Sequence, residues 1–437
     1  MKLVSNSFNA AIEYLSHFRT DDNTPLLFRP AGDSVVISIN GKAYAEYRCT
    51  VDAPLAERFA MPLRIPSRLA KELPEDVLIQ FKVGSHVKML VGTSSFTSPI
   101  LDVLSLQDPP KVIDGVAFNW DADVFIPELR AAVGHTLETR HADSKSCVLI
   151  EVLPARETIV ATNGAAMSWY EQKANAKNEM RRDDDALGTI LLHRANVPML
   201  LATCKSLGEV SIELGLSHLV VECGRRKSIL PVFSGAFPKW REVLKSVLDR
   251  PVAASVCVDR DKLIHAVRTV RPEAQVSGSL ELIVHAHDVE LRAESEAGGM
   301  ARTVIATEKP ATKFGPLQVS ASMLLSLCSG WPDEVPVWIE HRGTTSPLVF
   351  RRPRFRALLM PMIPKETKDE ESAVPNTDSR RVATSRSEES ARVLGDAPDR
   401  RGLSGFGPMP ADDVDAGSGQ GRVDEIEIGS GAGALAP

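Results

Sequence analysis

The residue types that most often carry out chemistry are scattered along this sequence. His285 and His287 are two residues apart, so on a strand they would share one face, but no third metal ligand follows at a definable spacing. Asp183, Asp184 and Asp185 lie in a polar stretch typical of a solvated loop. The motifs of zinc peptidases, serine hydrolases and phosphate-binding loops are missing. We therefore expect no catalytic residue, no metal site and no cofactor.

The cysteines predict a reducing environment. The six are far apart, form no C-x-x-C pair and mostly lie in apolar runs, which is typical of buried thiols. No apolar run approaches the roughly 20 residues that cross a bilayer, and Glu13 interrupts the first apolar stretch, where a signal peptide would need an unbroken one. We expect a cytoplasmic protein without membrane contact.

The net charge of −6 comes entirely from the C-terminal end. Residues 365–437 hold nine Lys/Arg and fifteen Asp/Glu, whereas residues 1–364 hold 42 of each. The C-terminal stretch is polar and rich in Gly and Ser, a composition that predicts a disordered tail. A neutral body excludes a uniformly basic coat, but it does not exclude a nucleic-acid partner.

A pattern of helices and strand pairs recurs three times in residues 1–364. Each copy begins with an amphipathic helix, marked by Phe8, Ile12, Leu15 and Phe18, then by Phe125, Leu129 and Val133, then by Leu263, Val267 and Val270. A second helix follows in each copy (65–73, 194–207 and 320–330), and after it come alternating strands. The sequence predicts an α+β protein of three repeated domains, 1–112, 118–249 and 252–364, each a sheet with two helices on one face, followed by the disordered tail 365–437.

Four segments of the body resemble one known family. They are ETIVATNGAAMSW (157–169), GEVSIELGLSHLVVECG (208–224), FPKWREVL (237–244), and SPLVF (346–350) with LLMPM (358–362). In their order and spacing they are similar to the beta subunit of bacterial DNA polymerase III, the sliding clamp. The resemblance implies a head-to-tail homodimeric ring with helices around a central hole, through which double-stranded DNA passes without being read for sequence. It also implies a non-enzymatic platform that tethers a DNA polymerase and is loaded by a clamp loader.

The resemblance implies a peptide-binding cleft between the second and third domains. The matching positions are Thr162, Gly164, Met167, Pro238, Val243, Ser346, Leu358, Leu359, Met360, Pro361 and Met362. The sequence departs from the family pattern at four positions: Ala165 and Ala166 replace a His-Arg pair, and Glu242 and Ile363 stand where basic residues are common. We expect a cleft with an apolar base and an altered rim.

The resemblance also implies a DNA-facing surface and two dimer edges. The basic residues expected on the helices that face DNA are Arg68, Lys71, Arg130, Lys205, Lys262 and Arg268. The first helix offers Glu13 and His17 instead. Phe96 and Val270 are expected near the edges at which two copies meet.

Two alternatives stay open at this point. One is a diverged clamp paralogue that keeps the ring but serves a restricted partner. The other, from a different class, is an enzyme built on a repeated α+β scaffold, against which the missing catalytic cluster argues.

Overall fold

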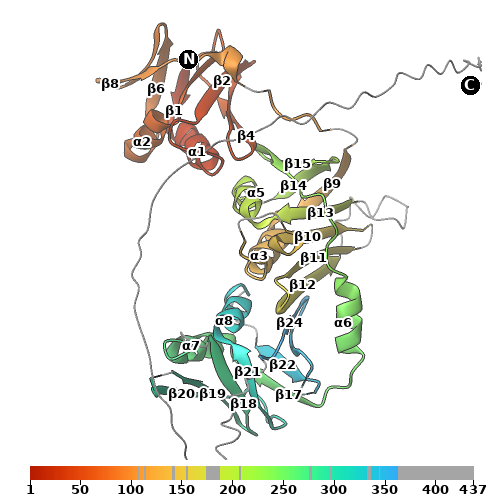
Figure 1. The fold of residues 1–437 in the computed structure, drawn as a ribbon. Helices are drawn as coiled ribbons and strands as arrows, with labels where there is room; N and C mark the ends of the chain where they lie inside the picture. Colours follow the sequence, from red (N-terminus) through yellow and green to blue (C-terminus); the bar gives the residue numbers. More distant parts are fainter. Residues whose placement is uncertain are drawn as a thin grey trace, which may run out of the picture. The chain divides into compact units, whose positions relative to one another are not determined.

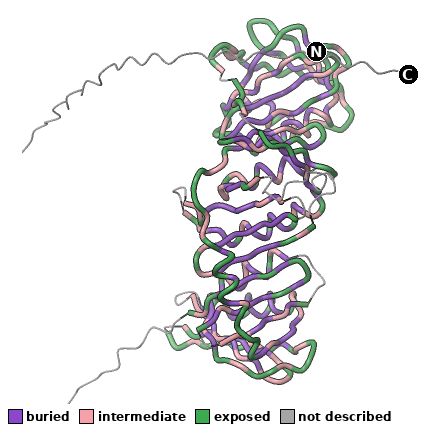
Figure 2. Tube along the Cα trace, turned by 90° about the vertical axis from the view of Figure 1, so that its right-hand side faces the viewer, coloured by how far each residue is buried: buried purple, intermediate pink, exposed green. Residues whose placement is uncertain are grey.

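The computed structural model describes residues 1–362, except for 107, 113–114, 140–142, 154–155, 174–187, 206–207, 275–277, 296, 332–335 and 344. These residues belong to one compact unit. The expected tail, 365–437, lies outside the described residues. Figure 2 shows buried positions running through the strands and helices of the body, with exposed positions mostly at the turns.

The same order of elements occurs three times. The first copy contains β1 (Lys2–Val4), α1 (Ser5–Ser16), β2 (Pro25–Ala31), β3 (Ser34–Asn40), β4 (Tyr44–Thr50), β5 (Phe59–Pro62), α2 (Arg64–Glu72), β6 (Leu78–Val83), β7 (His86–Val91) and β8 (Ser94–Pro99). The second contains β9 (Val116–Asp121), α3 (Ala122–Val133), β10 (Cys147–Val152), β11 (Arg156–Thr162), β12 (Ala166–Lys173), β13 (Gly188–His193), α5 (Val197–Thr203), β14 (Glu209–Leu214), β15 (His218–Cys223) and β16 (Arg226–Pro231). The third contains β17 (Ala254–Val258), α7 (Arg260–Val270), β18 (Ser279–Val284), β19 (Asp288–Glu294), β20 (Met300–Ala306), β21 (Phe314–Ser320), α8 (Ala321–Ser329), β22 (Val337–His341), β23 (Leu348–Arg352) and β24 (Phe355–Leu359).

The α+β class with a threefold repeat is confirmed, and the sheets differ from the expectation in number. Each repeat supplies two four-stranded groups, where the sequence predicted one sheet. The four sheets run β1-β6-β7-β8, β5-β2-β3-β4-β16-β15-β14-β9, β13-β10-β11-β12-β24-β23-β22-β17 and β20-β19-β18-β21. Alternation along a strand cannot reveal how the strands divide between sheets, because both groups bury one face in the same core.

The repeats are joined by backbone pairing between strands. β4 of the first repeat pairs antiparallel with β16 of the second, in the register Tyr44↔Ile229 to Tyr47↔Arg226. β12 of the second repeat pairs in the equivalent way with β24 of the third, from Ala166↔Leu359 to Tyr170↔Phe355. Each joint therefore makes one continuous eight-stranded sheet out of two repeats (Figure 1).

The six helices of the repeats form a contiguous row. Within each repeat the two helices contact each other: α1 with α2, α3 with α5, and α7 with α8. Between the first two repeats, the Tyr14 hydroxyl on α1 lies 3.3 Å from the Thr203 hydroxyl on α5. Between the last two, Ser326 on α8 donates to the carbonyl of Gly134 at 3.0 Å, at the end of α3. Gly330 permits this close approach, because an added Cβ would lie 2.7 Å from Ala131 Cα. In Figure 1 these helices cover one face of the sheets.

An additional helix, α6 (Trp240–Leu248), covers the opposite face. Its residues Trp240, Leu244 and Val247 join a second apolar cluster with Leu149 and Val160. Ile150 and Ile159, their neighbours along β10 and β11, point into the main core instead. Because side chains alternate across a strand, the two clusters lie on opposite faces of this sheet. The sequence carried a family resemblance over residues 237–244 but predicted no helix there.

The pH dependence of stability should carry the signature of Glu128, a buried carboxyl on α3. Burial raises the pKa of Glu128 from its usual value of 4.5 to about 8, partly opposed by Arg354. A folded-state pKa above the unfolded one gives stability that is complete below about pH 4.5 and is lost as the pH rises toward 8. We expect Glu128→Gln to match the parent near pH 4.5. By pH 8 its free energy of unfolding in urea should exceed that of the parent by about 1–2 kcal/mol. This is less than the full pKa shift of Glu128 would give at about 1.4 kcal/mol per pKa unit.

The control for this prediction is Glu75→Gln, since Glu75 is exposed at the surface. The control should follow the parent at every pH. A Glu128→Gln variant with the same pH profile as the parent would show that Glu128 ionises in the folded protein as it does in water.

Candidate functional site

The turn between β11 and β12 is held by its own side chains. The Thr162 hydroxyl donates to the Ala166 carbonyl at 2.8 Å and accepts from the Gly164 amide at 3.1 Å. The Asn163 side-chain oxygen accepts from the amides of Ala165 and Ala166. Gly164 has a φ of +94°, a conformation that other residues rarely adopt. The sequence N-G therefore fixes a rigid turn at one edge of the expected cleft.

The segment after β24 runs from this turn toward the third repeat. The Met360 amide donates to the Ala165 carbonyl at 2.9 Å, and the Met362 amide donates to the Gln318 carbonyl at 2.7 Å. Met167 and Leu358 face each other across β12 and β24 and are nearly buried, and both join the outer apolar cluster beside α6. They form an apolar base, whereas Met360 and Met362 keep 42% and 37% of their area exposed.

Helix α6 supplies the remaining wall. Trp240, Leu244 and Val247 face the sheet, and Val243 is left 47% exposed. Arg342 anchors the end of the helix, since it donates to the carbonyls of Leu248 and Arg250. The exposed methionines, Val243 and the half-buried Pro238 are thus accessible apolar side chains on three segments.

Two residues expected in the cleft lie elsewhere. Leu359 is completely buried in the main core, because it follows Leu358 along β24 and points to the opposite face. Ser346 is 1% exposed, and its hydroxyl accepts from Arg250 at 2.5 Å, so it serves to hold the third repeat to the end of α6. Neither side chain can contact a partner.

The altered rim is smaller than the sequence indicated. Ala166 is buried in the main core, so it forms no part of the rim, while Ala165 is half-buried at the turn. The Glu242 side chain is 71% exposed and lies 3.1 Å from Lys239. Ile363 lies outside the described residues. Of the four changed positions, Ala165 therefore lies at the turn and Glu242 is exposed on α6.

The fold of this chain is similar to those of several solved proteins. The sliding clamp (DNA polymerase III subunit beta) of Pseudomonas aeruginosa bound to griselimycin matches with a TM-score of 0.75 and 17% identity, over 83% of this chain and 99% of that one. DNA polymerase III beta of Thermotoga maritima matches with a TM-score of 0.72 and 12% identity over the same shares. Pol III beta of Caulobacter crescentus matches with a TM-score of 0.69 and 17% identity, over 83% of this chain and all of that one.

This chain has the sliding-clamp fold. No family model matches the sequence, and no curated protein sequence matches it. The likeness therefore lies in the fold, including the threefold repeat, at an identity too low to carry individual residues across. The 83% coverage leaves room for the C-terminal tail.

The expected DNA-facing residues lie on or next to the row of helices and are all exposed. They are Arg68 and Lys71 on α2, Arg130 on α3, Lys205 just after α5, and Lys262 and Arg268 on α7. Lys205 is 2.7 Å from Glu13 on α1, and this pairing lowers the pKa of Glu13. Glu13 thus neutralises Lys205. Lys262 lies 3.9 Å from Glu308, and the remaining basic side chains of the set are exposed.

The two residues expected at the dimer edges differ in exposure. Phe96 lies on β8, which ends its sheet, and is 37% exposed. Val270 is completely buried in the core of the third repeat, so it cannot contact a second chain from an edge. The sequence missed Met300 and Val304 on the other end strand, β20, which are 70% and 49% exposed. The sequence could have indicated them, because they are two large apolar residues on the side of a strand that is expected to be polar.

The described part of the chain shows no group of three or more His, Cys, Asp or Glu side chains that could hold a metal ion. His285 and His287 lie in the turn between β18 and β19, where a shared strand face was expected, and His285 approaches Glu290 at 3.3 Å. All six cysteines are buried and free. Within the described ranges, no helix is both long and apolar enough to cross a membrane. The acidic run at 183–185 lies outside the described residues.

The exposed methionines allow a direct test of the cleft. Met360→Ala should weaken the binding of a fluorescently labelled Q-L-x-L-F peptide by about tenfold, because a buried methionine contributes roughly 1.5–3 kcal/mol. Met300→Ala removes a more exposed methionine on β20, in a different sheet, and should leave peptide affinity unchanged. Fluorescence polarisation measures both variants. Equal affinities for Met360→Ala and the parent would place the partner surface elsewhere.

Proposed function

We propose that two copies of this chain close head to tail into a ring around double-stranded DNA, and that the ring tethers other proteins to that DNA. The observation that carries the proposal is the repeated strand pairing. The fourth strand of one repeat pairs with the last strand of another at both internal joints, β4 with β16 and β12 with β24. The corresponding strands left over are β20 of the third repeat and β8 of the first, and each ends its sheet.

A second copy would use these two edges in the same way. β20 of one chain would pair with β8 of the next, which repeats the internal joint. The contact joins different surfaces of the two chains, and such contacts give a closed ring when the rotation closes. An unpaired edge invites association with another strand, so a reproducible partner for β8 and β20 would also protect the chain from aggregation.

The side chains on the two edges suit such a contact. Phe96 on β8 and Met300 and Val304 on β20 would gain burial on pairing, at roughly 25 cal/mol for each Å² of apolar surface. The edge strands also carry Ser95 and Thr97 on β8 and Thr303 on β20, which are compatible with a strand interface.

The row of helices supports the DNA part of the proposal. Its exposed Arg and Lys side chains can neutralise phosphates without reading base sequence. The body as a whole has no net charge, so tight binding to DNA is not expected from it. A closed ring would hold DNA without tight binding, because a ring that encircles DNA cannot dissociate from it even when its contacts are weak.

The accessible methionines beside α6 support the partner function. Methionine adapts to different ligands, which fits a cleft that serves several proteins. By likeness to the DNA polymerase III clamps, we propose a DNA polymerase as one partner and a clamp loader as another. We place this activity in the cytoplasm and assign the chain no enzymatic reaction.

A second candidate is a clamp paralogue with a restricted partner. Ala165 and Glu242 favour it, since both change the rim of the cleft relative to the family pattern. Ala165→His should raise the affinity for a generic clamp peptide if the chain serves general partners poorly because of this position. An unchanged affinity would remove the support that Ala165 gives to this candidate.

Dimerisation should depend on the exposed edge residues. Phe96→Asp or Met300→Asp would force a charge into the proposed strand interface, which is costly without a partner. Sedimentation should show twice the 47.5 kDa chain mass for the parent and a single chain for either variant. Leu216→Asp is the control, since Leu216 is 77% exposed in the second repeat and lies on no free edge. A dimeric Phe96→Asp and a dimeric Met300→Asp together would contradict the interface.

Retention on DNA should depend on topology. Once loaded, the parent should remain on nicked circular DNA and leave when that DNA is linearised, whereas the single-chain Phe96→Asp variant should be retained on neither. Gel filtration of the protein–DNA mixture separates bound from free protein. Equal retention of the parent on circular and linear DNA would refute encirclement.

A further inference from the structure

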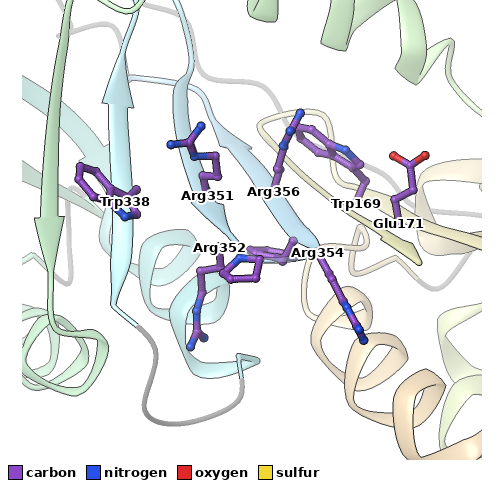
Figure 3. A pocket seen from close by; sticks show the side chains of 9 residues that line it. Trp169, Glu171, Trp338, Arg351, Arg352, Arg354 and Arg356 are labelled. Carbon is purple, nitrogen blue, oxygen red and sulfur yellow. The ribbon is translucent and has the colours of Figure 1, made fainter. Parts of the chain in front are cut away.

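A row of aromatic and basic side chains crosses the outer face of the sheet that joins the second and third repeats. Across four neighbouring strands the register is Trp338↔Arg351, Arg351↔Arg356 and Arg356↔Trp169. These four residues line a cavity of about 530 Å³, and Figure 3 shows their side chains next to one another above the strands. We call them the Trp-Arg row. It lies next to the cleft, because Trp169 and Arg356 each lie two residues from the cleft base at Met167 and Leu358.

The Trp-Arg row places like charges where they weaken the fold. Arg351 and Arg356 are directly opposite each other on β23 and β24, and like charges at this position destabilise a strand pair. Arg351 lies 3.4 Å from Glu340, while no ion pair to Arg356 occurs within the described residues. Packing and folding thus give no reason for the second arginine, whereas an anionic ligand would.

The surroundings add positive charge. The Lys309 ammonium lies over the Trp338 ring, 5.4 Å from its centroid. Arg354 at the tip of the β23–β24 hairpin is exposed, but Figure 3 shows its side chain pointing away from Arg351 and Arg356, toward helix α3, so it adds no charge to the row. Glu171, the acidic residue of the cavity wall, is paired with Arg156 at 2.9 Å. The row and its surroundings therefore combine Arg356, Lys309 and the Glu340-paired Arg351 with indole surface, which suits a peptide that alternates acidic and aliphatic residues.

The sequence contains such a peptide in its own tail. Residues 363–410 contain eight basic and nine acidic residues, so this part of the chain is almost neutral. Residues 411–428 carry six acidic residues and one basic residue. This acidic segment ends in Val-Asp-Glu-Ile-Glu-Ile (423–428), in which aliphatic and acidic side chains alternate. The acidic segment lies outside the described residues.

We propose that the acidic segment, residues 411–428, docks on the Trp-Arg row of the body. Its carboxylates pair with Arg351 and Arg356, and its Val and Ile side chains contact the indole of Trp338. Residues 363–410 connect the two, and at roughly 3.3 Å per extended residue they can span far more than the body requires. Covalent attachment raises the local concentration of the acidic segment toward the millimolar range, so weak contacts suffice.

Single-stranded nucleic acid is a poorer occupant of this surface. Bases would need open aromatic faces on which to stack, but Trp169 is only 5% exposed. The inference does not rest on the proposed ring or on DNA binding, since both the row and the acidic segment belong to one chain.

The proposal can be tested in the full chain by fluorescence quenching. All six native cysteines are buried, so Ser430→Cys provides one site for a bimane label next to the acidic segment. Docking brings the label near Trp338, which quenches bimane on contact. Arg351→Glu combined with Arg356→Glu should raise the fluorescence by about twofold or more, because each exposed ion pair shifts the equilibrium by a few-fold. In 1 M salt the fluorescence of the parent should rise in the same way, since ions then screen charge–charge attraction beyond about 3 Å.

Matched variants separate docking from general effects. Arg68→Glu combined with Lys71→Glu reverses the charge of two exposed residues on α2 and should leave quenching intact. Trp338→Phe should remove quenching without releasing the tail. Reversal of Asp424, Glu425 and Glu427 to Lys should restore quenching in the Arg351→Glu, Arg356→Glu background.

Two results would overturn the proposal. One is equal fluorescence of the parent and the Arg351→Glu, Arg356→Glu variant. The other is an unquenched parent whose Trp-Arg row binds a free, labelled polyglutamate peptide, because the occupant would then be an acidic segment of another protein.

Discussion

The body depends on the requirement that backbone edges be paired. A strand that ends a sheet leaves amide and carbonyl groups without partners, and the second repeat has two strands, β12 and β16, that meet this need by joining another repeat. At β4–β16 and β12–β24 the same pairing recurs. The joints fix the orientation of neighbouring repeats, and the contacts between α1 and α5 and between α3 and α8 follow. The helical row is therefore a consequence of strand pairing, and it carries exposed Arg and Lys side chains.

Because side chains alternate between the two faces of a strand, the outer face of the sheet and the main core carry different residues. Along β24, Leu358 and Arg356 point to the outer face, with α6 and the cleft, while Ala357 and Leu359 point into the main core. The outer face near α6 is apolar, and two residues further along the strands it becomes basic and aromatic. One sheet thus carries two adjacent surfaces of different chemistry, one suited to aliphatic anchors and the other to carboxylates.

The sequence predicted the parts of the fold that have a local signal. The apolar spacing at Phe8, Ile12 and Leu15 predicted α1, and the alternation after residue 76 predicted β6 and β7. The division into two sheets per repeat had no such signal, because either group buries one face. The predicted cleft residues Leu359 and Ser346, and Val270 at the dimer edge, proved buried. Leu359 was assigned to the cleft because it is next to Leu358 in the sequence. Successive side chains on a strand point to opposite faces, so Leu359 points into the main core.

The central claim is that β8 of one chain pairs with β20 of another. Amide hydrogen exchange measures this pairing at the backbone itself, when it is followed at protein concentrations above and below that of dimerisation. The account predicts that amides of Ser94–Thr97 and of Met300–Ala306 slow down at the higher concentration, while other edges such as β5 and β13 exchange at the same rate in both. Exchange in β8 and β20 that is fast and independent of concentration would contradict the ring.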